Sequence, residues 1–106
     1  MKIRIALAGL VASALLLTQA LIAADNAADA TFKAKCQMCH GANGAADTGM
    51  GKATRTLPVA DPSVKAMSAE EMFSVVKNGK LKMQPFKDKF SDQEIKDVTA
   101  YFRTLK

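Results

Sequence analysis

The chain has 106 residues, which fits one small domain and is too short for two independent hydrophobic cores. Apolar residues make up 49% of it and its formal net charge is +5, a composition typical of a globular protein and not of a disordered segment. One histidine excludes metal centres that need two or three imidazoles, and two cysteines exclude a fold held together by several disulfides.

The N-terminal segment has the parts of a secretory signal. Lys2 and Arg4 precede an uncharged apolar run over residues 5–17, and small residues that suit cleavage follow at Ala20, Ala23 and Ala24. We therefore predict that residues 1–24 are a signal peptide, cut somewhere between 20 and 24. The alternative is an uncleaved membrane anchor, because the 20 residues 5–24, interrupted only by Thr18 and Gln19, are just long enough to span a bilayer.

Residues 25–106 form the predicted domain. With 82 residues, its apolar core alone is marginal, and proteins of this size often depend on a disulfide or a cofactor. A first helix is predicted over roughly residues 27–37, with two cysteines at its end. In an exported protein, such a pair normally forms a disulfide or serves as a covalent attachment site.

The sequence Cys36-Gln37-Met38-Cys39-His40 carries the clearest chemistry in the chain. C-x-x-C-H is a signature of haem attachment. Two thiols three positions apart at a helix end can form thioethers with the two vinyl groups on one edge of a porphyrin. The next residue then lies under the ring, where an imidazole can bind the iron. We predict one covalent haem c held by Cys36 and Cys39, with His40 as the proximal iron ligand.

Three other uses of these residues remain open. A redox-active pair of the thioredoxin type would need a βαβ pattern around it, and a zinc site would need a fourth ligand. A disulfide between Cys36 and Cys39 would close a strained loop and leave His40 without a role. The sequence has neither a βαβ pattern nor a second C-x-x-C, so haem attachment is the favoured hypothesis.

Two capping boxes mark later helices. Residues 68–71 and 91–94 both have the pattern S-x-x-E, so we predict that helices begin at 68–69 and 91–92. The dipeptide Asn78-Gly79 should end the first of them. The second has apolar residues at helical spacing, namely Ile95, Val98, Phe102 and Leu105. No segment alternates with period two, so strands are not expected.

The loop between these helices contains the predicted distal iron ligand, Met83. This loop, residues 78–86, carries a glycine and a proline and is well separated from His40 along the chain. Such a loop can cross the distal face of a haem and present one thioether. With both axial positions filled by protein, an iron does one-electron transfer, and a thioether ligand raises its reduction potential relative to two histidines.

The other methionines of the domain fit this role less well. Met38 lies between the two cysteines and cannot reach the opposite face of the same ring, whereas Met67 and Met72 flank a helix start and are more typical of core residues. Met50 remains the main alternative ligand. An open iron position is the third possibility.

Together these motifs resemble the class I c-type cytochromes, in particular the small, soluble, monohaem bacterial kind. The resemblance covers about residues 28–106 and rests on Cys36-x-x-Cys39-His40-Gly41, on Asn78-Gly79 with Met83, and on the final helix. It implies an all-α fold of three to four helices around one covalent haem. It also implies that His40 is the proximal and Met83 the distal ligand.

The resemblance also implies how the ends of the domain pack. Ala28 and Phe32 of the first helix should cross Val98 and Tyr101 of the last. Many members of the family carry a proline soon after the motif, and its carbonyl accepts the imidazole N–H. Residues 41–52 contain no proline, so the acceptor for the His40 ring is unassigned, and a backbone carbonyl is expected to fill this role. A further difference is Gln84, which separates Met83 from Pro85 where many relatives have Met-Pro directly.

The function implied by the resemblance is non-enzymatic: a carrier that shuttles single electrons between larger redox complexes in the bacterial periplasm. Five lysines and one aspartate near Met83 give a local charge of +4, from Lys77, Lys80, Lys82, Lys87, Lys89 and Asp88. This cluster predicts redox partner proteins with an acidic docking surface, although a solvated face without a partner is the alternative. Nucleic acid is not an expected partner, because no basic stripe is interleaved with exposed aromatics.

Two other functions remain open. If residues 1–24 are retained, the chain is a membrane-tethered or complex-bound cytochrome subunit of an oxidase or a dehydrogenase. If the iron has an open position, the chain is a haem enzyme or a sensor.

Overall fold

The computed structural model describes residues 26–106, so the predicted signal peptide lies outside the described residues. Apart from one isolated bridge between Lys80 and Met83, the regular secondary structure of this part of the chain is helical. A helical segment covers residues 26–35 and is followed by α2 (Gln37–His40), α3 (Gly49–Ala53), α4 (Pro62–Lys65), α5 (Ala69–Asn78) and α6 (Asp92–Thr104). The prediction of an all-helical fold is confirmed.

The two longest labelled helices begin where the capping boxes predict. Ser68 Oγ accepts a hydrogen bond from the Glu71 N–H at 3.1 Å, and the Glu71 carboxylate accepts one from the Ser68 N–H at 3.0 Å. Ser91 and Glu94 repeat this reciprocal pair at the start of α6. Gly79 ends α5 with a φ of +79°, a conformation that glycine adopts without steric cost. Both predicted helix starts and the predicted stop are therefore confirmed.

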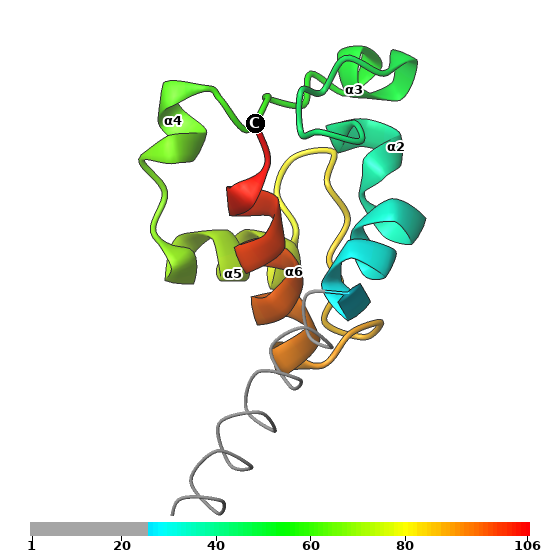
Figure 1. The fold of residues 1–106 in the computed structure, drawn as a ribbon. Helices are drawn as coiled ribbons and strands as arrows, with labels where there is room; N and C mark the ends of the chain where they lie inside the picture. Colours follow the sequence, from blue (N-terminus) through cyan, green and yellow to red (C-terminus); the bar gives the residue numbers. More distant parts are fainter. Residues whose placement is uncertain (1–25) are drawn as a thin grey trace, which may run out of the picture.

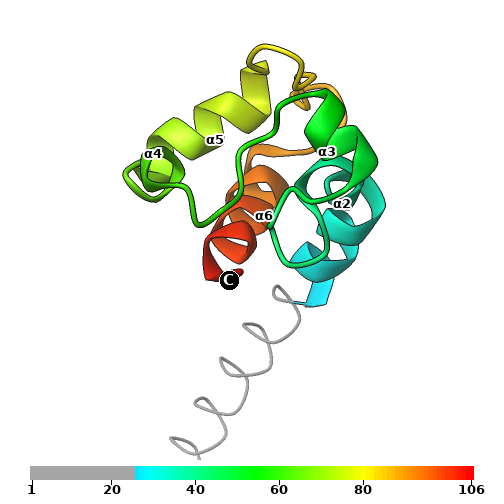
Figure 2. The ribbon, with the colours of Figure 1, turned by 90° about the horizontal axis from the view of Figure 1, so that it is seen from above.

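Helix α6 lies in the middle of the molecule, between α5 on one side and the helical segment 26–35 on the other (Figures 1 and 2). Phe32 and Ile95 are fully buried, and Ala28 and Val98 are buried beside them. The rings of Phe32 and Tyr101 lie 5.5 Å apart. This is the predicted crossing of the first helix over the last, and it forms the core of the domain.

Polar contacts also lie at the edge of the crossing between the first and last helices. The Tyr101 hydroxyl donates a hydrogen bond to Asp29 Oδ1 at 2.6 Å, and Lys33 forms an ion pair with the other oxygen of that carboxylate at 3.0 Å. These bonds hold the pKa of the Asp29 carboxyl below its usual value, the bond from Tyr101 being the larger cause. The packing of the terminal helices is thus supported by residues outside the apolar core.

No helix within residues 26–106 is long and apolar enough to cross a membrane.

Helix α3 packs closely on the end of α2. The Thr48 hydroxyl donates to the Met38 carbonyl at 2.6 Å and accepts from the Gly51 N–H at 2.9 Å, so one side chain joins the two helices. Gly51 is buried against backbone. A Cβ atom at this position would collide with the Cys39 carbonyl oxygen and would come within 2.8 Å of the Ala46 carbonyl oxygen. The residue must therefore be glycine for α3 to approach α2.

A Gly51→Ala substitution is expected to destabilise the domain by about 1–3 kcal/mol, the usual cost of forcing extra atoms into a packed site. The added methyl meets backbone rather than a flexible side chain, so relief requires α3 to move. Gly49→Ala is the matched control, because a Cβ there has no neighbour within 4 Å. Thermal unfolding of both purified variants measures the difference. Equal stability of the two variants would contradict this account of the packing.

Candidate functional site

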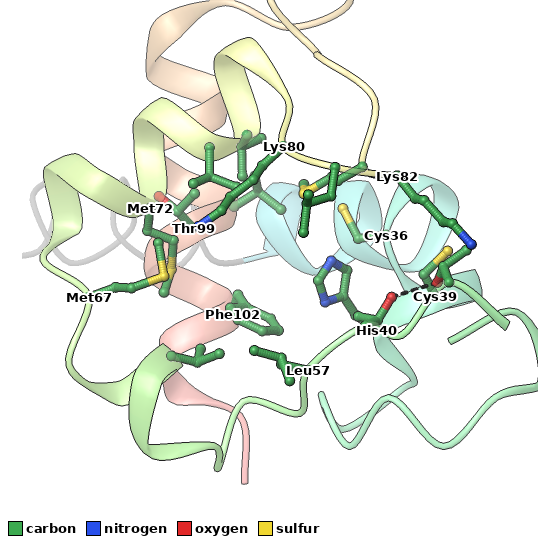
Figure 3. A pocket seen from close by; sticks show the side chains of 18 of the residues that line it. Cys36, Cys39, His40, Leu57, Met67, Met72, Lys80, Lys82, Thr99 and Phe102 are labelled. Carbon is green, nitrogen blue, oxygen red and sulfur yellow. Dashed lines mark hydrogen bonds between the residues drawn. The ribbon is translucent and has the colours of Figure 1, made fainter. Parts of the chain in front are cut away.

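A cavity of about 310 Å³ lies between α2, α5, α6 and the loops that connect them (Figure 3). Its volume is within the range of pockets that bind small molecules and cofactors, about 300–1,000 Å³. Most of its wall is apolar, with contributions from Phe32, Leu57, Val64, Met67, Met72, Val75, Val76, Met83, Val98 and Phe102. The cavity is therefore suited to a largely apolar group.

The four site residues predicted from the sequence all line this one cavity. Cys36 follows the helical segment 26–35 directly, and Cys39 and His40 are the last two residues of α2. Both cysteines are half-buried free thiols. Cys36 and His40 stand on the same side of the cavity in Figure 3. Met83 comes from a separate part of the chain, the loop after α5.

A tight turn presents Met83 at the cavity. The Lys80 N–H donates to the Met83 carbonyl at 3.1 Å, and the Met83 N–H donates to the Lys80 carbonyl at 2.9 Å. Leu81 at the tip has a φ of +54° and is 97% exposed. Lys82 Nζ donates to the Ala53 carbonyl at 3.4 Å, which joins the turn to the end of α3. The turn is thus closed by its own hydrogen bonds and is linked to the end of α3.

The burial of Cys36 bears on the alternative uses of the cysteine pair. Burial raises the pKa of the Cys36 thiol to about 11, so the thiol is protonated near neutral pH. Redox-active C-x-x-C pairs instead have a lowered thiol pKa. Within residues 26–106, no group of three or more His, Cys, Asp or Glu side chains could hold a metal ion. The raised pKa of Cys36 therefore argues against the thioredoxin-like hypothesis, and the lack of a metal-binding cluster in these residues argues against the zinc hypothesis.

His40 is half-buried, and its surroundings suit a metal ligand. Desolvation lowers the pKa of its imidazole, so the ring is neutral at pH 7 and has a lone pair to offer. Its Nδ1 atom is buried and has no hydrogen-bond partner among the residues that the structure describes. Buried polar atoms are nearly always paired, so an unpaired one marks a site with a function to explain.

The donor set fits a covalently bound haem. Two free thiols, a neutral imidazole and a thioether line a single, mostly apolar cavity. Thiols are the groups that attach haem c, and imidazole and thioether are its usual axial ligands.

Two further methionines line the cavity. Met67 and Met72 lie opposite His40 in the view of Figure 3, and Met72, on α5, is buried. Both were expected to be core residues, whereas in the structure they form part of the cavity wall. Met50, the main alternative ligand, is 47% exposed and is not part of the wall.

The lysine cluster reaches the mouth of the cavity at two positions. Lys80 and Lys82 line it, with Arg55 as a third cation (Figure 3 labels the lysines). Lys77 instead pairs with Asp92 at 3.1 Å. Part of the positive charge predicted from the sequence is therefore next to the cavity, and part is used between α5 and α6.

Other parts of the wall carry no sequence signal. The wall residues without such a signal are Thr54, Thr56, Leu57, Val64, Val75, Val76, Leu81 and Thr99. Apolar residues on α5 and α6 predict burial in general. Nothing in their spacing distinguishes a residue facing a cavity from one facing the core.

Comparisons with known proteins find a matching family, a similar protein and a similar solved structure. Residues 23–102 match the family model described as cytochrome c oxidase, cbb3-type, subunit III. A cytochrome c6 from Nostoc sp. is 38% identical over 71 residues, which are 66% of this chain. The matched region spans only 60% of the length of that relative.

A solved structure, the KustC0563 c-type cytochrome, has the same fold with a TM-score of 0.65 and 27% sequence identity. The match covers 71% of this chain and 92% of that one. The expected cytochrome c-like architecture is therefore confirmed. The chain has this fold and a single C-x-x-C-H motif, and most of its length matches the cbb3-type subunit III model. It therefore belongs to the monohaem c-type cytochrome family.

Proposed function

We propose that this protein is a one-electron carrier with one covalent haem c. Cys36 and Cys39 would hold the haem through thioether bonds, with His40 as the proximal and Met83 as the distal iron ligand. The observation that carries the proposal is the convergence of these four side chains, from two distant segments, on one apolar cavity.

The side chains of this chain have distinct roles in the proposed activity. The bound haem supplies one-electron redox chemistry at its iron. His40, neutral because desolvation lowers the pKa of its imidazole, would offer a nitrogen lone pair to the iron, and the soft thioether of Met83 would favour the ferrous state. With both of these side chains bound, no position at the iron would remain for a substrate. For that reason we propose a carrier and not an enzyme.

The absorption spectrum of the protein exported from a haem-loading host tests this proposal. We expect a reduced spectrum of the c type and, in the ferric form, the weak far-red band of a methionine–iron bond. A high-spin spectrum without that band would indicate an open iron position and would favour a haem enzyme or a sensor. Absence of haem would overturn the proposal altogether.

We further propose that the carrier is periplasmic and docks on acidic surfaces of larger redox proteins. The support is the signal-like segment 1–24 and the cations Lys80 and Lys82 at the cavity mouth. A Lys80→Glu/Lys82→Glu variant should react more slowly with an acidic redox protein at low salt, and the difference should disappear at high salt. Equal rates at all salt concentrations, measured by stopped flow, would exclude docking at this face.

A second candidate function is that of a subunit in a larger oxidase. The observation in its favour is the matching family model, which is described as subunit III of a cbb3-type oxidase. The intact mass of the purified protein separates the two candidates. Loss of residues 1–24 would support the free carrier, and their retention would support a tethered subunit.

A further inference from the structure

The proximal ligand proposed above lacks the usual means of orientation. Histidines that bind metals almost always donate their second ring N–H to a carbonyl, a carboxylate or a water, and this bond sets the plane of the ring. In residues 26–106, Nδ1 of His40 is buried and has no protein acceptor, so the backbone carbonyl expected from the sequence does not fill this role. The nearby segment 41–52 also has no proline to supply a carbonyl in the manner of many relatives. A contact of another kind can orient the imidazole ring.

Phe102 makes that contact. Its ring lies 5.1 Å from the His40 ring, centroid to centroid, with an angle of 68° between the planes. This is an edge-to-face arrangement, which is favourable for aromatic pairs and depends on orientation. Figure 3 shows the two rings next to each other in the cavity wall. Rotation of the imidazole about its bond to the Cβ atom would break this packing.

Phe102 is itself held in place. It lies on α6, the central helix, and its ring is 6.1 Å from that of Phe32, which is fully buried. Phe32 also packs on Tyr101, whose hydroxyl is bonded to Asp29. The position of Phe102 is therefore fixed by the crossing of the first and last helices, and not by the loop that follows the C-x-x-C-H motif.

We propose that Phe102 is the positioning residue for the proximal ligand: its ring sets the plane of the His40 imidazole by packing, in place of a hydrogen bond at Nδ1. The inference rests on the proposed haem attachment. Because Phe102 packs on Phe32, the orientation of the His40 ring would then depend on the packing of the domain core. A packing contact restrains a ring less sharply than a hydrogen bond, so the ligand orientation should respond to changes in the Phe102 side chain.

Proton NMR of the ferric protein tests the inference, because the hyperfine-shifted resonances of an axial imidazole depend on its plane. In Phe102→Leu we expect the His40 ring resonances to move or broaden, whereas Phe102→Tyr, which keeps the ring, should leave them near their original positions. Phe73→Leu is the matched control. Phe73 is a half-buried aromatic on α5 that contacts Lys96 of α6 and does not line the cavity. Its loss should lower stability without moving the His40 resonances.

The NMR result either supports or overturns the positioning role of Phe102. Unchanged His40 resonances in a haem-loaded Phe102→Leu protein, or equal changes in Phe73→Leu, would overturn the inference. If Phe102→Leu does not load haem, Phe102→Met fills a similar volume without an aromatic ring and is judged by the same criterion. Failure of the inference is distinct from failure of the proposed function, because the latter appears in the wild-type spectrum as absent haem.

Discussion

A Cys36→Ser/Cys39→Ser variant is expected to carry no covalent haem and to lose cooperative unfolding. Without the cofactor, the domain would contain an empty cavity of about 310 Å³. The apolar wall residues of this open cavity would then face water in place of the porphyrin, and the apolar burial that the haem provides would be lost. The whole free energy of unfolding of a native protein is only about 5–15 kcal/mol, so a small domain is sensitive to such a loss.

Two measurements check this expectation. Haem staining of the protein after denaturing electrophoresis reports covalent attachment, and circular dichroism during heating reports cooperative unfolding. Met38→Ser is the matched control, because Met38 lies between the two cysteines and is 70% exposed. It should keep its haem and its melting transition. A haem-free double variant that still melts cooperatively would show that the helices fold without the cofactor.

Replacement of Met83 by alanine should remove the far-red ferric band and lower the reduction potential. The thioether stabilises ferrous iron, and its loss opens the position to water, a harder ligand that favours ferric iron. Ligands and surroundings together spread haem potentials over about 0.8 V, so a fall of about 0.1 V is a reasonable scale for one ligand. A spectroelectrochemical titration measures both quantities in the same sample.

The other methionines are the controls for Met83. Met50 is exposed and outside the cavity wall, so Met50→Ala should leave the band and the potential unchanged. Met67 and Met72 are stricter tests, because both line the cavity. If the band is lost in Met67→Ala or Met72→Ala and kept in Met83→Ala, the methionine whose replacement removes the band is the distal ligand. Absence of the band from the unsubstituted protein would point to a ligand other than methionine.

Local interactions explain why so much of this fold was predictable from the sequence. A capping box joins a serine to a glutamate three residues later, and both boxes are present in the structure at the expected positions. The C-x-x-C-H motif is equally local, because the reactive groups must lie within about one helical turn of each other. The crossing of Phe32 over Tyr101 came from the family resemblance instead, and the structure confirms it.

The surroundings of the ligands could not be predicted in the same way. The sequence alone favoured Met50 over Met67 and Met72 as an alternative ligand, whereas the structure exposes the first and brings the other two to the cavity. No pattern indicated that the segment 54–57 would form part of the wall. These outcomes depend on the packing of α5 and α6 and on the route of the loops, which many weak contacts decide together.

By itself, the sequence determined the helix starts, the reactive motif and the family, because each depends on residues a few positions apart or on a pattern shared by relatives. Only the tertiary structure decided which methionines reach the cavity and that Nδ1 of His40 is buried without a described partner. It alone brought Phe102 against the His40 ring, across more than sixty residues of chain. The physical reason is that burial and ring contacts arise from the relative placement of whole helices, which no short stretch of sequence specifies.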